Sequence, residues 1–126
     1  MEHQIYYHDT DAGGIVYYAN YLKYLEEART EFLEARGLGI QPFLKQGLLY
    51  AVRSCQIVYK APARYGDIIC SDAVLEKMTG AQLFFKQKVW QKATNQVLVD
   101  AEVVLVCLNK DFKPCSIPAD MKAKLA

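Results

Sequence analysis

The stretch from Tyr6 to Tyr21, YYHDTDAGGIVYYANY, decides how the rest of the chain is organised. It starts as the end of a strand, passes an acidic turn and two glycines, and enters a helical pattern at about Tyr17. Gly13 and Gly14 allow backbone conformations that other residues avoid, or a close approach to a ligand. The stretch thus puts a carboxylate beside the free N–H groups and partial positive charge of a helix N-terminus. Acyl-transfer sites need such a combination.

The same residues also have a simpler interpretation. An Asp-Thr-Asp sequence before a helix is common as turn and cap chemistry, and a Gly-Gly pair is common in loops. Other catalytic patterns are missing from the sequence, including Gly-x-Ser-x-Gly, Ser-x-x-Lys and a phosphate-binding glycine loop. The acidic residues remain as the candidates for catalysis.

Length and composition indicate an ordinary globular protein. The 126 residues predict one domain, 1–126, with no room for a second core. Apolar residues make up 52%, charged residues 23%, and the net charge is +1, which does not favour nucleic acid as a partner. No window predicts a membrane span and the N-terminus has no signal-peptide pattern, so we expect a cytoplasmic protein.

Metal sites and disulfides are not favoured by the sequence. The four cysteines are Cys55, Cys70, Cys107 and Cys115. None forms a Cys-x-x-Cys pair and three lie in apolar runs, so small buried hydrophobic residues are the better interpretation than zinc ligands or a disulfide. His3 and His8 are too isolated for a metal site, although His8 is close in sequence to Asp11.

A short strand is predicted over residues 3–7, followed after the acidic loop by one long helix. The helix should begin at about Tyr17 or Asn20 and run to Arg36, because Gly37 is a typical stop. Its apolar positions form one stripe, widened by two neighbours: Tyr21, Leu25, Ala28, Phe32 and Ala35, with Leu22 and Tyr24. A loop with at most one helical turn is expected over residues 42–47.

Four strand-like runs follow, joined by short turn-rich breaks. They cover about residues 49–61, 68–78, 82–91 and 97–108. Short connections join antiparallel neighbours, so the runs should form a meander. Five strands and one long helix give an α+β fold, in which a five-stranded antiparallel sheet curls around the helix.

Two strand-like runs carry further information. Along residues 82–91, Lys86, Lys88 and Lys92 share a face with aromatic residues, which indicates either a solvated face or a surface for a polyanion such as phosphates. The run over residues 97–108 becomes apolar on both faces, which suggests that a partner subunit covers part of this small domain.

Several segments together resemble a known family. They are DTDAGGIVY at 9–17, NY at 20–21, EAR at 27–29, YKAPAR at 59–64, KP at 113–114 and IP at 117–118. This ordered set is similar to the hotdog-fold acyl-CoA thioesterases, in the 4-hydroxybenzoyl-CoA thioesterase family and its YbgC-like branch. The resemblance covers nearly the whole chain and implies a hotdog fold and hydrolysis of a thioester.

The resemblance also implies roles for individual residues. In that family the aspartate at the position of Asp11 attacks the thioester carbonyl or activates water, and the sequence does not distinguish the two. The backbone N–H at the position of Tyr18 hydrogen-bonds the thioester carbonyl. Close relatives usually carry glutamate at the position of His8 and histidine at that of Tyr18, so the acyl preference and the proton transfer are left open.

For coenzyme A, the resemblance implies contacts from Lys88 and Lys113, with Lys60, Arg64 and Lys86 as weaker additions. Coenzyme A is then part of the substrate, and no separate cofactor or metal is expected. The expected substrate is an acyl-CoA or acyl-carrier-protein thioester, and the expected assembly is a homotetramer built as a dimer of dimers.

The sequence leaves two other functions open. One is a non-catalytic acyl-thioester-binding protein that keeps the fold without turnover. The other is a hotdog dehydratase, which needs a histidine paired with an acid on the helix, and the predicted helix contains no histidine.

Overall fold

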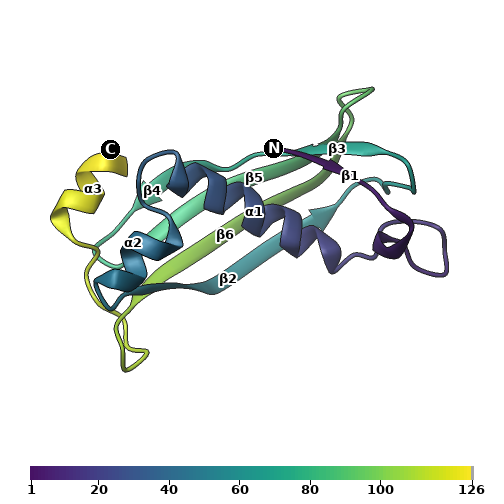
Figure 1. Cartoon of the computed structure of the whole chain (residues 1–126). Coiled ribbons are helices and arrows are strands. Elements are labelled where there is room, and N and C mark those ends of the chain that lie inside the picture. The colour runs from purple at the N-terminus through teal and green to yellow at the C-terminus, as the bar shows by residue number, and fades with distance from the viewer. Residues whose placement is uncertain (126) are drawn as a thin grey trace.

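A computed structural model describes residues 1–125 of the chain (Figure 1). In chain order its elements are β1 (Glu2–Gln4), η1 (Tyr7–Asp9), α1 (Asn20–Glu34), α2 (Ile40–Lys45), β2 (Leu49–Tyr59), β3 (Ile68–Ser71), β4 (Val74–Met78), β5 (Gln82–Gln91), β6 (Val97–Leu108) and α3 (Ala119–Leu125). None of the helices within residues 1–125 is long and apolar enough to cross a membrane.

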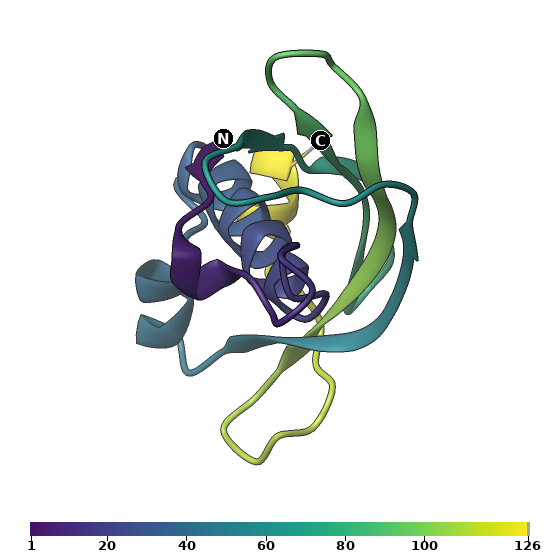
Figure 2. The same cartoon turned by 90° about the vertical axis from the view of Figure 1, so that its right-hand side faces the viewer.

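The strands form one antiparallel sheet in the order β1-β3-β5-β6-β2, with β4 also paired to β5. Figure 2 shows this sheet curling around α1, which lies along its concave face. The predicted arrangement of an antiparallel sheet around one long helix is therefore confirmed. The sheet has six strands rather than five, because the predicted run over residues 68–78 is divided in two.

The division of that run has a cause in its side chains. The Asp72 carboxylate accepts a hydrogen bond of 2.7 Å from the Lys88 backbone N–H, and the Asp72 carbonyl accepts one of 3.1 Å from the Gln87 side-chain amide. These side-chain bonds interrupt the regular ladder between β5 and its neighbour, so β3 ends at Ser71 and β4 begins at Val74. The predicted bounds of β5 and β6 agree with the structure.

The predicted meander is wrong for β2. This strand does not lie beside β3, which follows it in sequence, but pairs with β6 at the far edge of the sheet. The register runs from Leu49 opposite Leu108 to Tyr59 opposite Val99. Only β6 is long enough to pair with all of β2, and the segment after β2 carries the chain to the opposite edge (Figure 1).

The predicted first strand is too long. β1 ends at Gln4, and residues 7–9 form the short 3-10 helix η1. The Asp9 carboxylate accepts a 2.8 Å hydrogen bond from the Tyr6 backbone N–H, which fixes this turn. The predicted loop at residues 42–47 is also corrected, because α2 starts earlier, at Ile40.

The long helix ends close to its predicted stop. Gly37 has a φ of +73°, and the Leu38 N–H donates to the Leu33 carbonyl over 2.8 Å, which closes the last turn. Two residues of the predicted apolar stripe, Leu22 and Ala35, are exposed. The buried residues of α1 are Tyr21, Tyr24, Leu25, Ala28, Arg29 and Leu33.

The edge strand β2 leaves apolar surface uncovered. Val52 is 54% exposed and Val58 is 58% exposed. By contrast, β6 lies in the interior of the sheet, and its outward-facing Val104 and Val106 are already half-buried. The uncovered apolar strand is thus β2 rather than β6, and its outer edge has no neighbour within residues 1–125.

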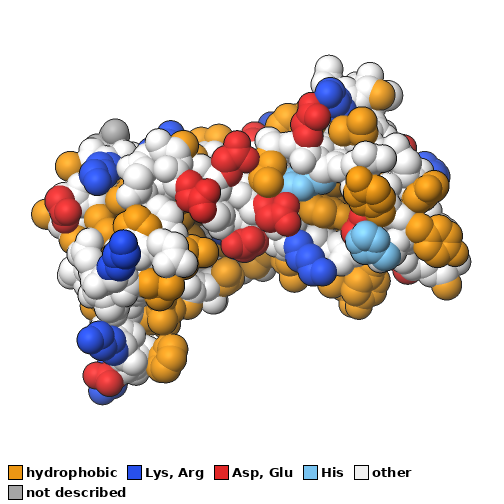
Figure 3. Space-filling model, in the orientation of Figure 1, with side chains coloured by type: hydrophobic (Ala, Val, Ile, Leu, Met, Phe, Trp, Pro, Cys, Tyr) orange, Lys and Arg blue, Asp and Glu red, His pale blue; other side chains and the backbone are white. Residues whose placement is uncertain are grey.

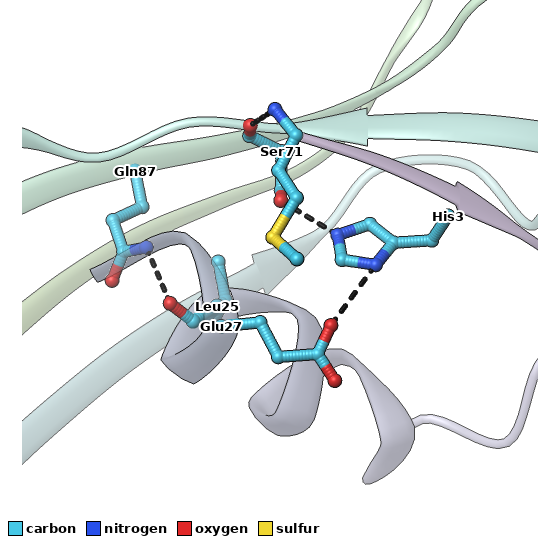
Figure 4. Close-up of polar contacts among 6 residues, drawn as sticks. His3, Leu25, Glu27, Ser71 and Gln87 are labelled. Carbon is cyan, nitrogen blue, oxygen red and sulfur yellow. Dashed lines mark hydrogen bonds and ion pairs between the residues drawn. The ribbon is translucent and has the colours of Figure 1, made fainter. Parts of the chain in front are cut away.

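Two buried polar contacts fasten α1 to the sheet (Figure 4). The Gln87 amide donates to the Leu25 carbonyl over 2.9 Å, and its oxygen accepts a 3.0 Å bond from Arg29. On the other side, the His3 ring lies between Glu27 of α1, at 3.2 Å, and the Ser71 hydroxyl of β3, at 2.8 Å. These contacts hold β1 and the start of the acidic loop against the helix.

The His3 contact should make stability depend on pH. Burial lowers the pKa of His3 below its ordinary value of 6.5, and this effect outweighs the opposing charge of Glu27. The unfolded chain therefore binds the His3 proton more readily than the folded chain, so the free energy of unfolding should fall as pH drops below 6.5. We expect His3→Gln to make the free energy of unfolding depend less steeply on pH. The change in slope should be smaller than about 1.4 kcal/mol per pH unit, which is the most that one proton can contribute.

Urea unfolding at a series of pH values between 7.5 and 5 measures this slope. His8→Gln is the matched control for loss of an imidazole, because the His8 side chain is 82% exposed. Equal slopes for wild type and His3→Gln would contradict the assignment.

Candidate active site

The acidic loop is a tight turn closed by backbone hydrogen bonds. Thr10 and Val16 pair as an isolated antiparallel bridge, and inside it the Asp11 N–H donates to the Ile15 carbonyl over 2.9 Å. The Gly14 N–H donates a hydrogen bond to the Asp11 carbonyl over 3.0 Å, and Gly14 has a φ of +78°. A glycine at position 14 is required because other residues are strained at this angle.

The Asp11 carboxylate is oriented by this turn and left open on one side. Its Oδ1 accepts a 2.8 Å hydrogen bond from the Gly13 N–H, while the side chain is exposed. A Cβ at position 13 would lie 3.2 Å from that oxygen, so glycine also gives the carboxylate its room. No donor in the described part of the chain hydrogen-bonds Oδ2, so this oxygen is left free on an exposed side chain.

The start of α1 supplies donors next to the loop. The Tyr17 N–H and the Asn20 side-chain amide both donate to the Asp9 carbonyl, each over 2.9 Å. The N-cap residue, Ala19, makes no side-chain cap, and the Tyr18 N–H has no acceptor among residues 1–125. A backbone donor and a helix N-terminus are thus left available for a developing negative charge.

Asp9 and Asp11, two residues apart, have different environments. The Asp9 side chain is 18% exposed, and it is occupied by the Tyr6 N–H. The nearby Tyr24 hydroxyl is buried without a hydrogen-bond partner within residues 1–125, and burial together with the charge of Asp9 raises the pKa of Tyr24. Asp9 is therefore built into the fold, whereas Asp11 faces solvent.

His8 does not contact Asp11. Its ring stacks on Tyr6 with centroids 6.0 Å apart, and its Nε2 lies 3.6 Å from the Asp9 carboxylate. His8 is therefore close to Asp11 in sequence but does not contact it in the structure.

Exposed aromatic side chains surround this end of the molecule. Tyr7 is 79% exposed, Tyr18 62% and Tyr65 64%. The Tyr59 hydroxyl donates to the Tyr18 carbonyl over 3.0 Å and so braces the entry to α1. Sequence reasoning gave Tyr59 no such role, and only the tyrosine content of the chain signalled this cluster. Figure 3 shows hydrophobic side chains gathered here, with acidic ones over α1.

The expected coenzyme A residues do not form one cluster. Lys86 and Lys88 lie on the outer face of the sheet, opposite Glu102 and Asp100 of β6. With Asp72 they line an open groove of about 670 Å³, in which three carboxylates outnumber the two lysines. Lys86 is also paired with a carboxylate of β4 over 3.2 Å.

The other three basic residues are spread along the molecule. Lys60 is ion-paired with Asp100 on the same sheet face. Arg64 pairs with Ile15 in an isolated bridge and is therefore the basic residue beside the Asp11 loop. Lys113 lies between β6 and α3, at the opposite end of the molecule (Figure 1). One subunit alone does not bring Lys113 and Asp11 together.

A separate cleft lies between α1, α2 and β2. Its volume is about 180 Å³ and its lining is mostly apolar, including Leu33, Phe43 and Val52. The cleft is alongside the second half of α1, away from the helix N-terminus that follows the acidic loop.

Known proteins match this chain over almost its full length. Residues 6–125 match the thioesterase-like superfamily. The acyl-CoA thioester hydrolase YbgC of Escherichia coli is 36% identical over 96% of this chain and 90% of its own. The acyl-CoA thioesterase YbgC of Haemophilus influenzae is 34% identical over 95% and 88%.

A solved structure agrees with the fold described above. The probable thioesterase of Bartonella henselae superposes with a TM-score of 0.87 and 28% identity, over 94% of this chain and 97% of that one. The curled sheet around α1 is accordingly the hotdog fold that the family resemblance implied. With a match across residues 6–125, the chain belongs to the thioesterase-like superfamily and is a YbgC-like hotdog thioesterase.

Proposed function

We propose that this protein hydrolyses acyl-CoA thioesters to a free carboxylic acid and coenzyme A, with Asp11 and the Tyr18 backbone N–H as the reacting pair. The observation that carries the proposal is the Asp11 carboxylate, held by the Gly13 N–H with one oxygen open, beside the uncapped start of α1. The names of the YbgC relatives support the same reaction.

The proposed chemistry uses the loop and the helix together. As the thioester carbonyl is attacked, negative charge grows on its oxygen, and the Tyr18 N–H and the helix N-terminus stabilise it. The free oxygen of Asp11 either attacks the carbonyl carbon, giving an anhydride that water then opens, or removes a proton from the attacking water. In both routes the C–S bond breaks and the thiol leaves with a proton. No metal or separate cofactor takes part in this scheme.

For substrate binding we propose charge contacts to the phosphates of coenzyme A from Lys88 and Lys113, with weaker ones from Lys60, Arg64 and Lys86. Arg64 is the best placed for a substrate at Asp11, because its backbone pairs with the loop. The separation of Lys113 from Asp11 supports a site shared by two subunits. An acyl-carrier-protein thioester is the alternative substrate.

We further propose that the subunits associate through β2 into a dimer and then a dimer of dimers. The 11-residue edge strand with two valines more than half exposed supports this arrangement. The cytoplasm is the proposed location, where reducing conditions keep thiols free, as they are in the four cysteines.

The first prediction separates the two aspartates. Asp11→Asn keeps the Gly13 hydrogen bond but removes charge and basicity, so kcat for the best acyl-CoA should fall by at least about 10²-fold, with KM within a few-fold. Asp9→Asn should lose far less, because Asp9 acts on the backbone and not on substrate. Steady-state kinetics with thiol detection measures both variants.

Thermal unfolding of the two variants is the control for folding. Equal, small losses of kcat at Asp9 and Asp11 would refute the catalytic assignment. A protein that binds acyl-CoA without turnover would then be the better interpretation, namely a non-catalytic acyl-thioester-binding protein.

The second prediction concerns the phosphates. Lys88→Ala should raise KM for an acyl-CoA several-fold, leave kcat nearly unchanged, and weaken the dependence of KM on salt, because exposed charge contacts are screened by ions. A truncated thioester without phosphates should show no change in KM. Lys92→Ala is a matched control just after the end of β5, since Lys92 is already paired with Glu2. An unchanged KM for Lys88→Ala would mean that this face is only solvated.

The third prediction concerns assembly. Wild type should sediment as a dimer or tetramer at micromolar concentration, because obligate interfaces bury on the order of 2,000 Å² or more. Val58→Lys should yield folded monomers with strongly reduced activity, since a lysine on β2 opposes strand pairing. Val74→Lys on β4, where the valine is 56% exposed, should keep the dimer. A fully active wild-type monomer would contradict the shared site.

A further inference from the structure

The end of β6 and the segment after it form a small hairpin that brings two cysteines together. Leu108 and Pro114 pair as an antiparallel bridge, and next to it the Cys115 N–H donates to the Cys107 carbonyl over 3.0 Å. The two sulfur atoms are 3.4 Å apart. The Asn109 side chain fixes the turn, because its oxygen accepts hydrogen bonds from two backbone N–H groups within it.

We propose that Cys107 and Cys115 are a redox modification site, at which a hydroperoxide converts the two thiols into a disulfide. Directly opposed residues of an antiparallel pair have Cα atoms about 4.5–5.5 Å apart, and disulfides need about 4.4–6.8 Å. The bond would therefore form without moving the backbone.

The two thiols have different roles in this chemistry. Cys115 is half-buried and within reach of a small peroxide, whereas Cys107 is 1% exposed. Burial and the contact with Cys115 raise the pKa of Cys107 to about 12, so Cys107 remains a thiol until the second step. Cys115 is thus the thiol that is oxidised first.

The reaction balances without any further reagent. The Cys115 thiolate attacks one oxygen of hydrogen peroxide, the O–O bond breaks, and a sulfenic acid and hydroxide form. The Cys107 sulfur then attacks the sulfenic sulfur, an S–S bond forms, and the leaving hydroxide takes the Cys107 proton as water. The hydroxide of the first step takes the proton that Cys115 released. Two thiols and one peroxide give one disulfide and two waters.

The other cysteines have no such neighbour. Cys55 is exposed on β2 and Cys70 is buried on β3, and within residues 1–125 neither has a second thiol in hydrogen-bond contact. The new bond would therefore be confined to the hairpin. It would fix the segment that leads to Ile117 and Met121, both buried in the core, and that carries Lys113.

Counting thiols after peroxide treatment tests the proposal, and it does not depend on the proposed thioesterase activity. In a Cys55→Ser background, which removes the exposed thiol, hydrogen peroxide should reduce three free thiols to one, with a mass loss of about 2 Da. Peptide mapping should join Cys107 to Cys115, and dithiothreitol should restore three thiols. The oxidised form should melt roughly 5 °C or more above the reduced form.

The double variant Cys55→Ser, Cys115→Ser is the control and should keep both of its thiols under the same treatment. Since this change affects a half-buried position, circular dichroism of the untreated variant checks its fold. Retention of three thiols in the Cys55→Ser protein, or loss of thiols in the double variant, would overturn the proposal.

Discussion

The Asp9 carbonyl oxygen holds the site together. It accepts one hydrogen bond from the Tyr17 backbone and one from the Asn20 side chain, and so joins the acidic loop to the first turn of α1. Because both bonds end on a single atom, the loop and the helix N-terminus form one rigid unit. The direction of the Asp11 carboxylate relative to the free Tyr18 N–H is a consequence of that unit. The same aspartate whose backbone does this has a side chain committed to the preceding turn.

That unit is in turn held by the contacts between α1 and the sheet. Gln87 projects from β5 among apolar neighbours and binds both the helix backbone and Arg29, so a buried guanidinium is satisfied by a neutral partner. Burial lowers the pKa of Arg29, but a guanidinium keeps its charge under ordinary conditions. His3 in the same way ties β1 to α1 and β3 through Glu27 and Ser71. A short strand of three residues is thereby kept in place, and the loop that follows it has a fixed starting point.

Much of this fold could be predicted from the sequence, because its signals are local. Alternating apolar residues and the turns around Gly80 and Asn95 fixed the bounds of β5 and β6, and Asn95 adopts the positive φ that such a turn requires. The position of β2 was not predictable, since strand order depends on partners distant in sequence. The break at Asp72 was missed for the same reason: the bonds that cause it come from β5.

The candidate site likewise has features that local sequence signals predicted and features that depend on partners distant in sequence. The distinction between Asp9 and Asp11 needed the hydrogen-bond pattern of the turn, although both were visible as acidic residues before a helix. Periodicity correctly predicted that Lys86 and Lys88 share one face. It could not predict the carboxylates that other strands bring to that face. A polar residue at an apolar position of β5, Gln87, was the available signal for the buried contacts beneath α1.

A crystal structure of the wild-type protein with a ketone analogue of an acyl-CoA, in which a methylene replaces the thioester sulfur, tests the central claim most directly. The analogue keeps the carbonyl but cannot be hydrolysed. The account predicts its oxygen about 3 Å from the Tyr18 backbone nitrogen, with an Asp11 carboxylate oxygen facing the carbonyl carbon. A carbonyl bound instead in the cleft between α1, α2 and β2, with the Tyr18 N–H unoccupied, would contradict it.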